Sequence, residues 1–115
     1  MIGCIIQARM GSSRLPGKVM MKIQNRPIID YVVTQVQYSK KIKRIVLATT
    51  KDENDDVIVD YANEKNISIF RGKEGDVLDR YYQCAKHFSF SAVVRITSDN
   101  PLIDPEIIDE IVTLF

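Results

Sequence analysis

The sequence predicts an α/β fold, a three-layer sandwich in which a mainly parallel sheet carries helices on its faces. Short apolar runs alternate four times with longer segments whose apolar residues recur at helical spacing. Each alternation implies a crossover connection between parallel strands. The chain has 115 residues and no internal repeat or linker, which indicates one domain with one core.

The first half of the chain predicts two strands and two helices. Residues 2–8 (IGCIIQA) and 44–50 (RIVLATT) are typical of buried strands. Between them, Pro27 suits the first turn of a helix. Its expected core face consists of Ile28, Ile29, Val32, Val33 and Val36. The second helix is expected over 54–66, with a cap at Asn54 or Asp55.

The second half repeats this order. Residues 67–70 (ISIF) predict a third strand, and Asp76 predicts the cap of a helix that runs to Phe88. The side chains expected on the core face of that helix are Val77, Leu78, Tyr81, Tyr82, Ala85 and Phe88. Residues 92–96 (AVVRI) predict the fourth strand. Asp104 and Pro105 then predict the start of a last helix.

Parallel strands end at one edge of a sheet, and open α/β sheets bind ligands there, near a switch in strand order. Four loops are expected at this edge: 8–18, 49–54, 71–76 and 97–104. The first and last of them are the richest in groups that bind ligands. We therefore expect the functional site where these two loops meet.

Basic residues are concentrated near the N-terminus. Residues 1–29 contain five of the 16 basic residues and none of the 15 acidic ones. A cluster confined to one loop suits a small anionic ligand, whereas a nucleic-acid-binding surface would raise the pI above 7.7. No apolar run reaches the length of a membrane span, and no signal-peptide pattern is present. Cys4 and Cys84 are expected to be buried, reduced thiols in a cytoplasmic protein.

The segment 8–18 (ARMGSSRLPGK) differs from the Walker A loop, which requires G-x-x-x-x-G-K-[ST]. Five residues separate Gly11 from Gly17, and Val19 stands where a hydroxyl is needed. The segment instead offers glycines that let N–H groups approach an oxyanion, together with three cations: Arg9, Arg14 and Lys18. Hydrogen bonds to charged partners contribute about 1.5–3 kcal/mol each, so three of them could hold a triphosphate. The alternative is a solvated basic turn.

Asp99 follows the fourth predicted strand at the same edge of the sheet. Beside bound phosphates, a carboxylate commonly holds magnesium, which takes oxygen ligands and keeps several waters. The alternative is that Asp99 only begins the Asp-Asn-Pro turn. The residues themselves favour neither interpretation.

The chain resembles the cytidylyltransferases that activate acidic sugars, the acylneuraminate-type synthetases of CMP-sugar acids. Four segments carry the likeness: IIQARMGSSRLPGKV, VLATT, IFRGKEGDVLDRYY and VRITSDNPLIDPEII. The first resembles the family pattern A-R-x-x-S-x-R-x-P-G-K, and all four match the SpsF-like branch of spore-coat polysaccharide proteins in order and spacing. The resemblance covers essentially the whole chain. It implies a Rossmann-like, GT-A-like nucleotidyltransferase fold, CTP and a small acidic sugar as substrates, Mg²⁺ as cofactor, and a homodimer.

The resemblance also implies roles for individual residues. Arg9 and Lys18 would act in catalysis, and Asp99 would hold the metal. The nucleotide would be bound by Ala8, Arg9, Gly11, Ser12, Ser13, Arg14, Lys18, Thr49, Arg71 and Thr97. Asp79-Arg80 resembles the end of the Ser-Gly-Thr-[Asp/Glu]-Arg segment of the related synthetases. Thr97 stands where those synthetases carry glutamine, so the base and the sugar stay open.

Family members are about twice as long as this chain. The resemblance therefore implies that residues 1–115 form the nucleotide-binding N-terminal portion of such a domain, with the acceptor-binding half absent. The implied reaction is attack of a sugar hydroxyl on the α-phosphorus of CTP, with release of pyrophosphate. Two alternatives stay open: a nucleotide-binding domain without turnover, and a GT-A-type glycosyltransferase, whose usual D-x-D motif is missing here.

Overall fold

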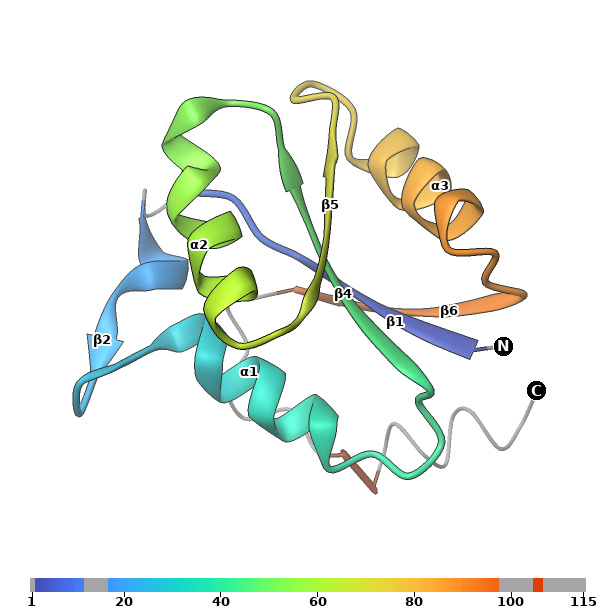
Figure 1. Cartoon of the computed structure of the whole chain (residues 1–115), viewed down its shortest axis with the longest axis horizontal. Helices are drawn as coiled ribbons and strands as arrows, with labels where there is room; N and C mark the ends of the chain where they lie inside the picture. The colour runs from blue at the N-terminus through green and yellow to red at the C-terminus, as the bar shows by residue number, and fades with distance from the viewer. Residues whose placement is uncertain (1, 12–16, 98–104, 107–115) are drawn as a thin grey trace.

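The computed structural model describes residues 2–11, 17–97 and 105–106, and its elements follow the predicted alternation (Figure 1). The main strands are β1 (Ile2–Gln7), β4 (Arg44–Thr50), β5 (Ser68–Gly72) and β6 (Ala92–Thr97). The helices are α1 (Ile28–Gln37), α2 (Asp56–Glu64) and α3 (Val77–His87). The smaller elements are two 3-10 turns, η1 (Lys18–Met20) and η2 (Glu53–Asp55), and two short strands, β2 (Lys22–Ile23) and β3 (Arg26–Pro27). Pro105 and Glu106 are helical, whereas Asp104 and the rest of the expected last helix lie outside the described residues.

The four main strands form one sheet in the order β5-β4-β1-β6, and every neighbouring pair is parallel. Strand β4 pairs with one side of β1 and β6 with the other, so the strand order reverses at β1. All four strands end at the same edge, which we call the carboxyl edge. The predicted parallel sheet is confirmed, and the end of β1 lies where open α/β sheets bind ligands.

Helices cover both faces of this sheet, as Figure 1 shows. Successive residues of β1 point to opposite faces, as expected for a strand. On one face, Ile6 packs among core residues of α1 and α2, including Ile29, Val32 and Ile58. On the other face, Ile5 packs with Tyr81 and Cys84 of α3. The predicted three-layer sandwich is therefore confirmed.

Helix α3 begins as expected but contacts the sheet through a different face. The carboxylate of Asp76 accepts the Asp79 N–H at 3.0 Å, which confirms the predicted cap. Val77, Leu78 and Tyr82 were expected in the core, but they are 41%, 67% and 61% exposed. The buried side chains are Arg80, Tyr81 and Cys84. The prediction was wrong because it assigned every apolar residue to the core and left out Arg80, the largest of the fully buried side chains in the described residues.

A small hairpin separates the first loop from α1. Strands β2 and β3 pair antiparallel, and the two residues between them, Gln24 and Asn25, have φ angles of 52° and 67°. Two successive positive φ angles are typical of a type I′ turn, which matches the twist of a hairpin. Pro27 was expected inside the first helical turn. It ends β3 in an extended conformation and is the N-cap residue of α1, so the helix begins one residue later than expected.

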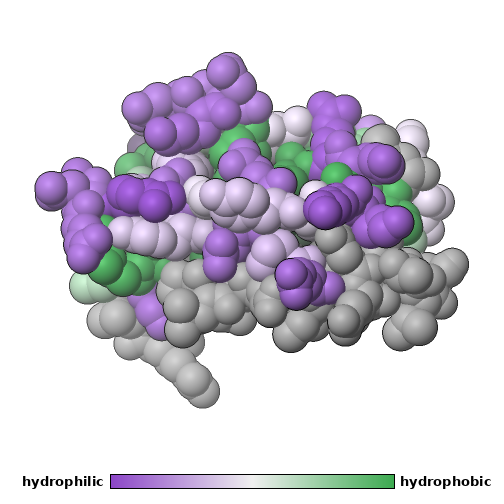
Figure 2. Space-filling model, turned by 90° about the horizontal axis from the view of Figure 1, so that it is seen from below, coloured by the Kyte–Doolittle hydropathy of each residue, from purple (hydrophilic) through white to green (hydrophobic). Residues whose placement is uncertain are grey.

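Both cysteines are free and fully buried, which confirms that part of the prediction. Burial raises the pKa of each thiol to about 12. On the face seen in Figure 2, the described side chains are mostly hydrophilic, with apolar ones in small patches. Within the described ranges, no helix is long and apolar enough to cross a membrane.

Candidate functional site

The end of β1 carries the first predicted site residues. Ala8 is buried and its N–H donates to the Ala48 carbonyl at 2.9 Å, so the strand pairing extends one residue beyond β1. Arg9 and Gly11 follow at the carboxyl edge, and Gly11 is exposed. A Cβ at Gly11 would lie 3.2 Å from Nη2 of Arg9, so the guanidinium lies close beside the glycine backbone. This leaves backbone and cation together at the surface, as an anion site requires.

Met10 and Gly17 close the base of the predicted phosphate loop. The Gly17 N–H donates to the Met10 carbonyl at 2.8 Å, which brings the two ends of the loop together. Gly17 has a φ of 78°, a left-handed conformation that glycine adopts without steric cost. Lys18 follows directly in η1. The two predicted catalytic residues, Arg9 and Lys18, therefore flank one closed loop base.

Asp55 is buried at this edge and was missed as a site residue. It is 2% exposed, and its Oδ1 accepts the Met10 N–H at 2.7 Å. Its Oδ2 accepts a hydrogen bond from the Thr50 hydroxyl. Sequence reasoning offered Asn54 or Asp55 as a helix cap, and Asp55 is the N-cap residue of α2, but its side chain makes no capping hydrogen bond. The side chain that caps in this corner is Asp52, which accepts the Asn54 N–H at 2.7 Å and caps the 3-10 turn η2 before α2.

Arg71, predicted to contact the nucleotide, holds the turn between β4 and α2. Its Nε donates to the Thr50 carbonyl at 2.7 Å and its Nη2 to the Asp52 carbonyl at 2.8 Å. Its Nη1 pairs with the Asp56 carboxylate, also at 2.8 Å. Thr49 pairs with Arg71 in the sheet register but is fully buried, and its hydroxyl has no partner among the described residues.

Arg80 is a second buried charge near the carboxyl edge. Its Nη1 donates to the carbonyls of Lys73 (2.6 Å) and Glu74 (3.0 Å), and its Nε to the Gln7 side-chain oxygen (3.3 Å). Burial lowers the pKa of this guanidinium, and the nearby positive charge of Arg9 lowers it further. Sequence reasoning assigned Arg80 no role beyond its place in a motif, because a fully buried arginine leaves no periodic signal.

Thr97 is exposed at the end of β6 and pairs with Gln7 of β1, so it also lies at the carboxyl edge. The predicted nucleotide ligands Ser12, Ser13 and Arg14 and the predicted metal ligand Asp99 lie outside the described residues. Within 2–11, 17–97 and 105–106, no group of three His, Cys, Asp or Glu side chains could hold a metal ion.

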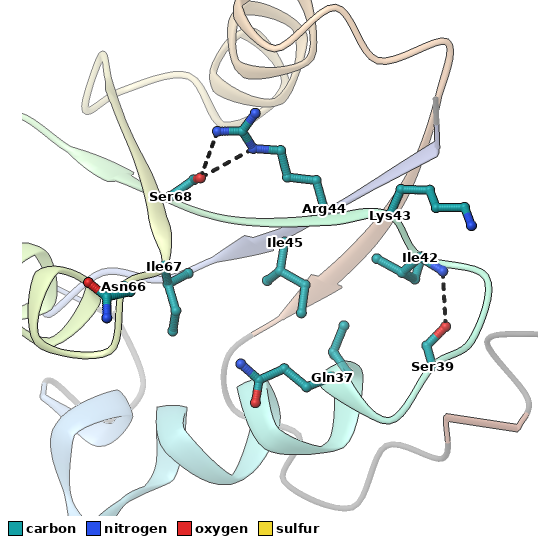
Figure 3. A pocket seen from close by; sticks show the side chains of 10 residues that line it. Gln37, Ser39, Ile42, Lys43, Arg44, Ile45, Asn66, Ile67 and Ser68 are labelled. Carbon is teal, nitrogen blue, oxygen red and sulfur yellow. Dashed lines mark hydrogen bonds between the residues drawn. The ribbon is translucent and has the colours of Figure 1, made fainter.

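A small cavity of about 40 Å³ marks the site, lined by Arg9, Gly11, Asp52, Asn54, Asp55 and Glu74. Two larger hollows lie elsewhere. One of about 330 Å³ is at the amino-terminal end of the sheet, where the Arg44 guanidinium donates to Ser68 (Figure 3). The other, of about 370 Å³, lies between the hairpin and α2. Neither is lined by a predicted site residue. We therefore choose the small cavity as the candidate site because Arg9 and Gly11 line it, although it is not the largest.

Comparison with known proteins yields matches along almost the whole chain. A family model described as "Cytidylyltransferase" matches residues 3–114. The spore coat polysaccharide biosynthesis protein SpsF of Bacillus subtilis is 39% identical over 109 residues, which cover 91% of this chain and 45% of that protein. The 3-deoxy-manno-octulosonate cytidylyltransferase of Lawsonia intracellularis is 35% identical over 116 residues, covering 96% and 44% respectively.

Among solved structures, a cytidylyltransferase from Leptospira borgpetersenii superposes with a TM-score of 0.94 at 38% identity, covering 99% of this chain and 48% of that one. This likeness confirms the expected nucleotidyltransferase fold. The chain spans slightly less than half the length of these relatives.

Proposed function

We propose that this chain, which belongs to the cytidylyltransferase family, binds CTP at its carboxyl edge as part of an enzyme that transfers CMP to an acidic sugar. The observation that carries the proposal is the closed base of the phosphate loop. The hydrogen bond between Met10 and Gly17 forms this base after β1, where the strand order reverses, and Arg9 and Lys18 are the adjacent residues in sequence. Residues 1–115 would be the nucleotide-binding N-terminal portion of the enzyme.

The names of the relatives support an acidic sugar as the acceptor. One of them acts on 3-deoxy-manno-octulosonate, a sugar acid, and another belongs to spore coat polysaccharide biosynthesis. By analogy, we assign the reaction to the synthesis of a surface polysaccharide or glycan. The enzyme would work in the cytoplasm as a homodimer, and neither nucleic acid nor membrane would be its partner.

In the proposed reaction, a hydroxyl of the acceptor attacks the α-phosphorus of CTP, the bond to the bridging oxygen breaks, and pyrophosphate leaves. Arg9 and Lys18 would hold the phosphate oxygens on which negative charge builds, so the protein contributes position and charge rather than a covalent step. The other proposed nucleotide contacts are Ala8, Gly11, Ser12, Ser13, Arg14, Thr49, Arg71 and Thr97. Arg71 would reach the nucleotide only by exchanging contacts that it makes with the turn after β4.

Mg²⁺ is the proposed cofactor, and Asp99 is the proposed ligand. A carboxylate oxygen suits this ion, which keeps several waters when it binds a nucleotide. When bound, the ion would neutralise charge on the triphosphate.

The test is release of pyrophosphate from CTP with Mg²⁺ and a panel of sugar acids, measured on an enzyme in which residues 1–115 are joined to an acceptor-binding portion. We expect release with a sugar acid, and a loss of about 10²–10³-fold in rate for Lys18→Ala, because one preorganised donor is removed. Lys22→Ala is the matched control, because Lys22 lies in the hairpin outside the loop. CTP binding without release would favour the alternative, a nucleotide-binding domain without turnover. Equal rates for both variants would contradict the assignment of Lys18.

A further inference from the structure

We propose that Asp55 is a positioning residue: its buried carboxylate holds the base of the phosphate loop against the corner between β4 and α2. That the loop binds CTP rests on the proposed function, whereas the role of Asp55 in holding Met10 rests on geometry alone. Nothing in the sequence pattern indicates the role, since Met10 and Asp55 are 45 residues apart.

Met10 forms the loop base with both of its main-chain polar groups, each of which makes a hydrogen bond. Its carbonyl accepts the Gly17 N–H at 2.8 Å, which closes the loop. Its N–H donates to Oδ1 of Asp55 at 2.7 Å, which ties the closed base to another part of the fold. Arg9 and Gly11 are the immediate neighbours of Met10, so a shift of this residue would displace the cation and the glycine together.

The corner that holds Asp55 is itself anchored to two strands. The Thr50 hydroxyl, at the end of β4, donates to the second oxygen of the Asp55 carboxylate. Arg71 of β5 donates to the carbonyls of Thr50 and Asp52. A carboxylate can accept both donors at once, one on each oxygen, and no neutral aliphatic side chain could do so. The loop base at Met10 is therefore held by residues of β4 and β5 as well as by its connection to β1.

A direct contact between Asp55 and the triphosphate would not favour binding, because both groups are negative. Any contribution of Asp55 to affinity must therefore act through the loop. A site displaced by about 1 Å can lose about 100-fold in rate, and supporting residues exist to prevent this. Asparagine keeps the shape and can accept the Met10 N–H, whereas alanine removes the acceptor entirely. The two substitutions thus separate hydrogen bonding from charge.

The first test is hydrogen exchange of the Met10 amide, which needs no ligand. We expect slow exchange in the wild-type chain and in Asp55→Asn, and at least tenfold faster exchange in Asp55→Ala. The Ala8 amide, bonded to Ala48, is the internal control and should stay protected. Fast exchange at Met10 in the wild-type protein would overturn the proposal even if Asp55→Ala did not fold. An equal rise at Met10 and Ala8 in Asp55→Ala would also overturn it, because the effect would then be general destabilisation.

The second test is calorimetric titration with CTP and Mg²⁺. Asp55→Ala should bind at least tenfold more weakly, whereas Asp55→Asn should stay within about threefold of the wild type. Tyr61→Phe is the control for general destabilisation, because it loses one hydrogen bond to Asp30 away from the loop. If Asp55→Asn binds as weakly as Asp55→Ala, the role belongs to the charge and the positioning account fails. If the wild-type chain does not bind CTP, the proposed function fails, while the exchange result still decides the role of Asp55 in holding Met10.

Discussion

The main-chain N–H of Met10 donates to the Asp55 carboxylate at 2.7 Å and so connects the first loop of the sheet to the corner after β4. The bond joins the loop after β1 to η2, the 3-10 turn after β4, and β1 and β4 lie side by side in the sheet. Because the carbonyl of Met10 is also bonded to Gly17, the same residue closes the loop and anchors it. The base of the proposed phosphate site is thus attached, through Met10, to the turn that follows β4.

Two adjacent buried threonines should respond oppositely to the same substitution. Thr50→Val removes the hydroxyl that donates to Asp55 and accepts the Asp52 N–H, so we expect a loss of about 1–3 kcal/mol in the free energy of unfolding. Thr49→Val removes a buried hydroxyl that has no partner within the described part of the chain. It should leave stability unchanged or raise it by up to about 1 kcal/mol. Urea denaturation measures both, and equal losses would contradict the assigned hydrogen bonds.

Gly72 should resist substitution because Arg80 passes directly beside it. A Cβ at Gly72 would lie 2.6 Å from Cγ of Arg80 and 3.2 Å from Cε2 of Phe70. We expect Gly72→Ala to cost about 1–3 kcal/mol, because the buried arginine would have to move. Gly75→Ala is the control, since a Cβ there meets no atom within 4 Å. Thermal unfolding of the two variants should differ by several degrees. Equal melting temperatures would mean that Arg80 is not packed against β5.

The buried thiols predict a loss of stability at alkaline pH. Burial raises the pKa of Cys4 and Cys84 from 9.0 to about 12 in the folded chain. Between these values, the unfolded chain releases the thiol protons while the folded chain keeps them. The unfolded state then binds fewer protons, so stability falls as pH rises, by up to about 1.4 kcal/mol per pH unit for each thiol.

The measurement for the thiols is a urea denaturation series between pH 8 and about 11, compared with a Cys4→Ala, Cys84→Ala double variant. The wild type should lose stability more steeply than the variant, because other groups that titrate in this range are common to both. Parallel curves for the two proteins would show that the thiols do not contribute.

The fold could be predicted from sequence because strand and helix periods are local. The apolar face of α1 and the cap at Asp76 follow from short segments, and both were confirmed. The buried face of α3 could not be predicted in full. Arg80 can be buried because its guanidinium donates hydrogen bonds to residues such as Gln7, which is distant in sequence. The turn at Gln24 and Asn25 lacks the glycine that usually marks a hairpin of this type.

The candidate site could be predicted from the sequence only for residues whose type itself indicates a binding role, such as cationic side chains. Arg9 and Lys18 stand out as cations in a glycine-containing loop, and each is adjacent in sequence to one of the two residues, Met10 and Gly17, that close the loop base. The role of Asp55 depends on a main-chain donor 45 residues away, so the residue looked like an ordinary cap at the start of a helix. Arg71 was predicted only from the family resemblance, and its contacts to the carbonyls of Thr50 and Asp52 depend on the pairing of β4 with β5.

The most direct test of the central claim, that the carboxyl edge holds the nucleotide phosphates, is calorimetric titration of the chain with CTP and Mg²⁺. Arg9→Ala should bind at least tenfold more weakly than the wild type, because a charge-assisted hydrogen bond to phosphate contributes about 1.5–3 kcal/mol. Arg44→Ala, at the opposite end of the sheet, should bind like the wild type. Unchanged affinity in Arg9→Ala, or a loss confined to Arg44→Ala, would contradict the claim.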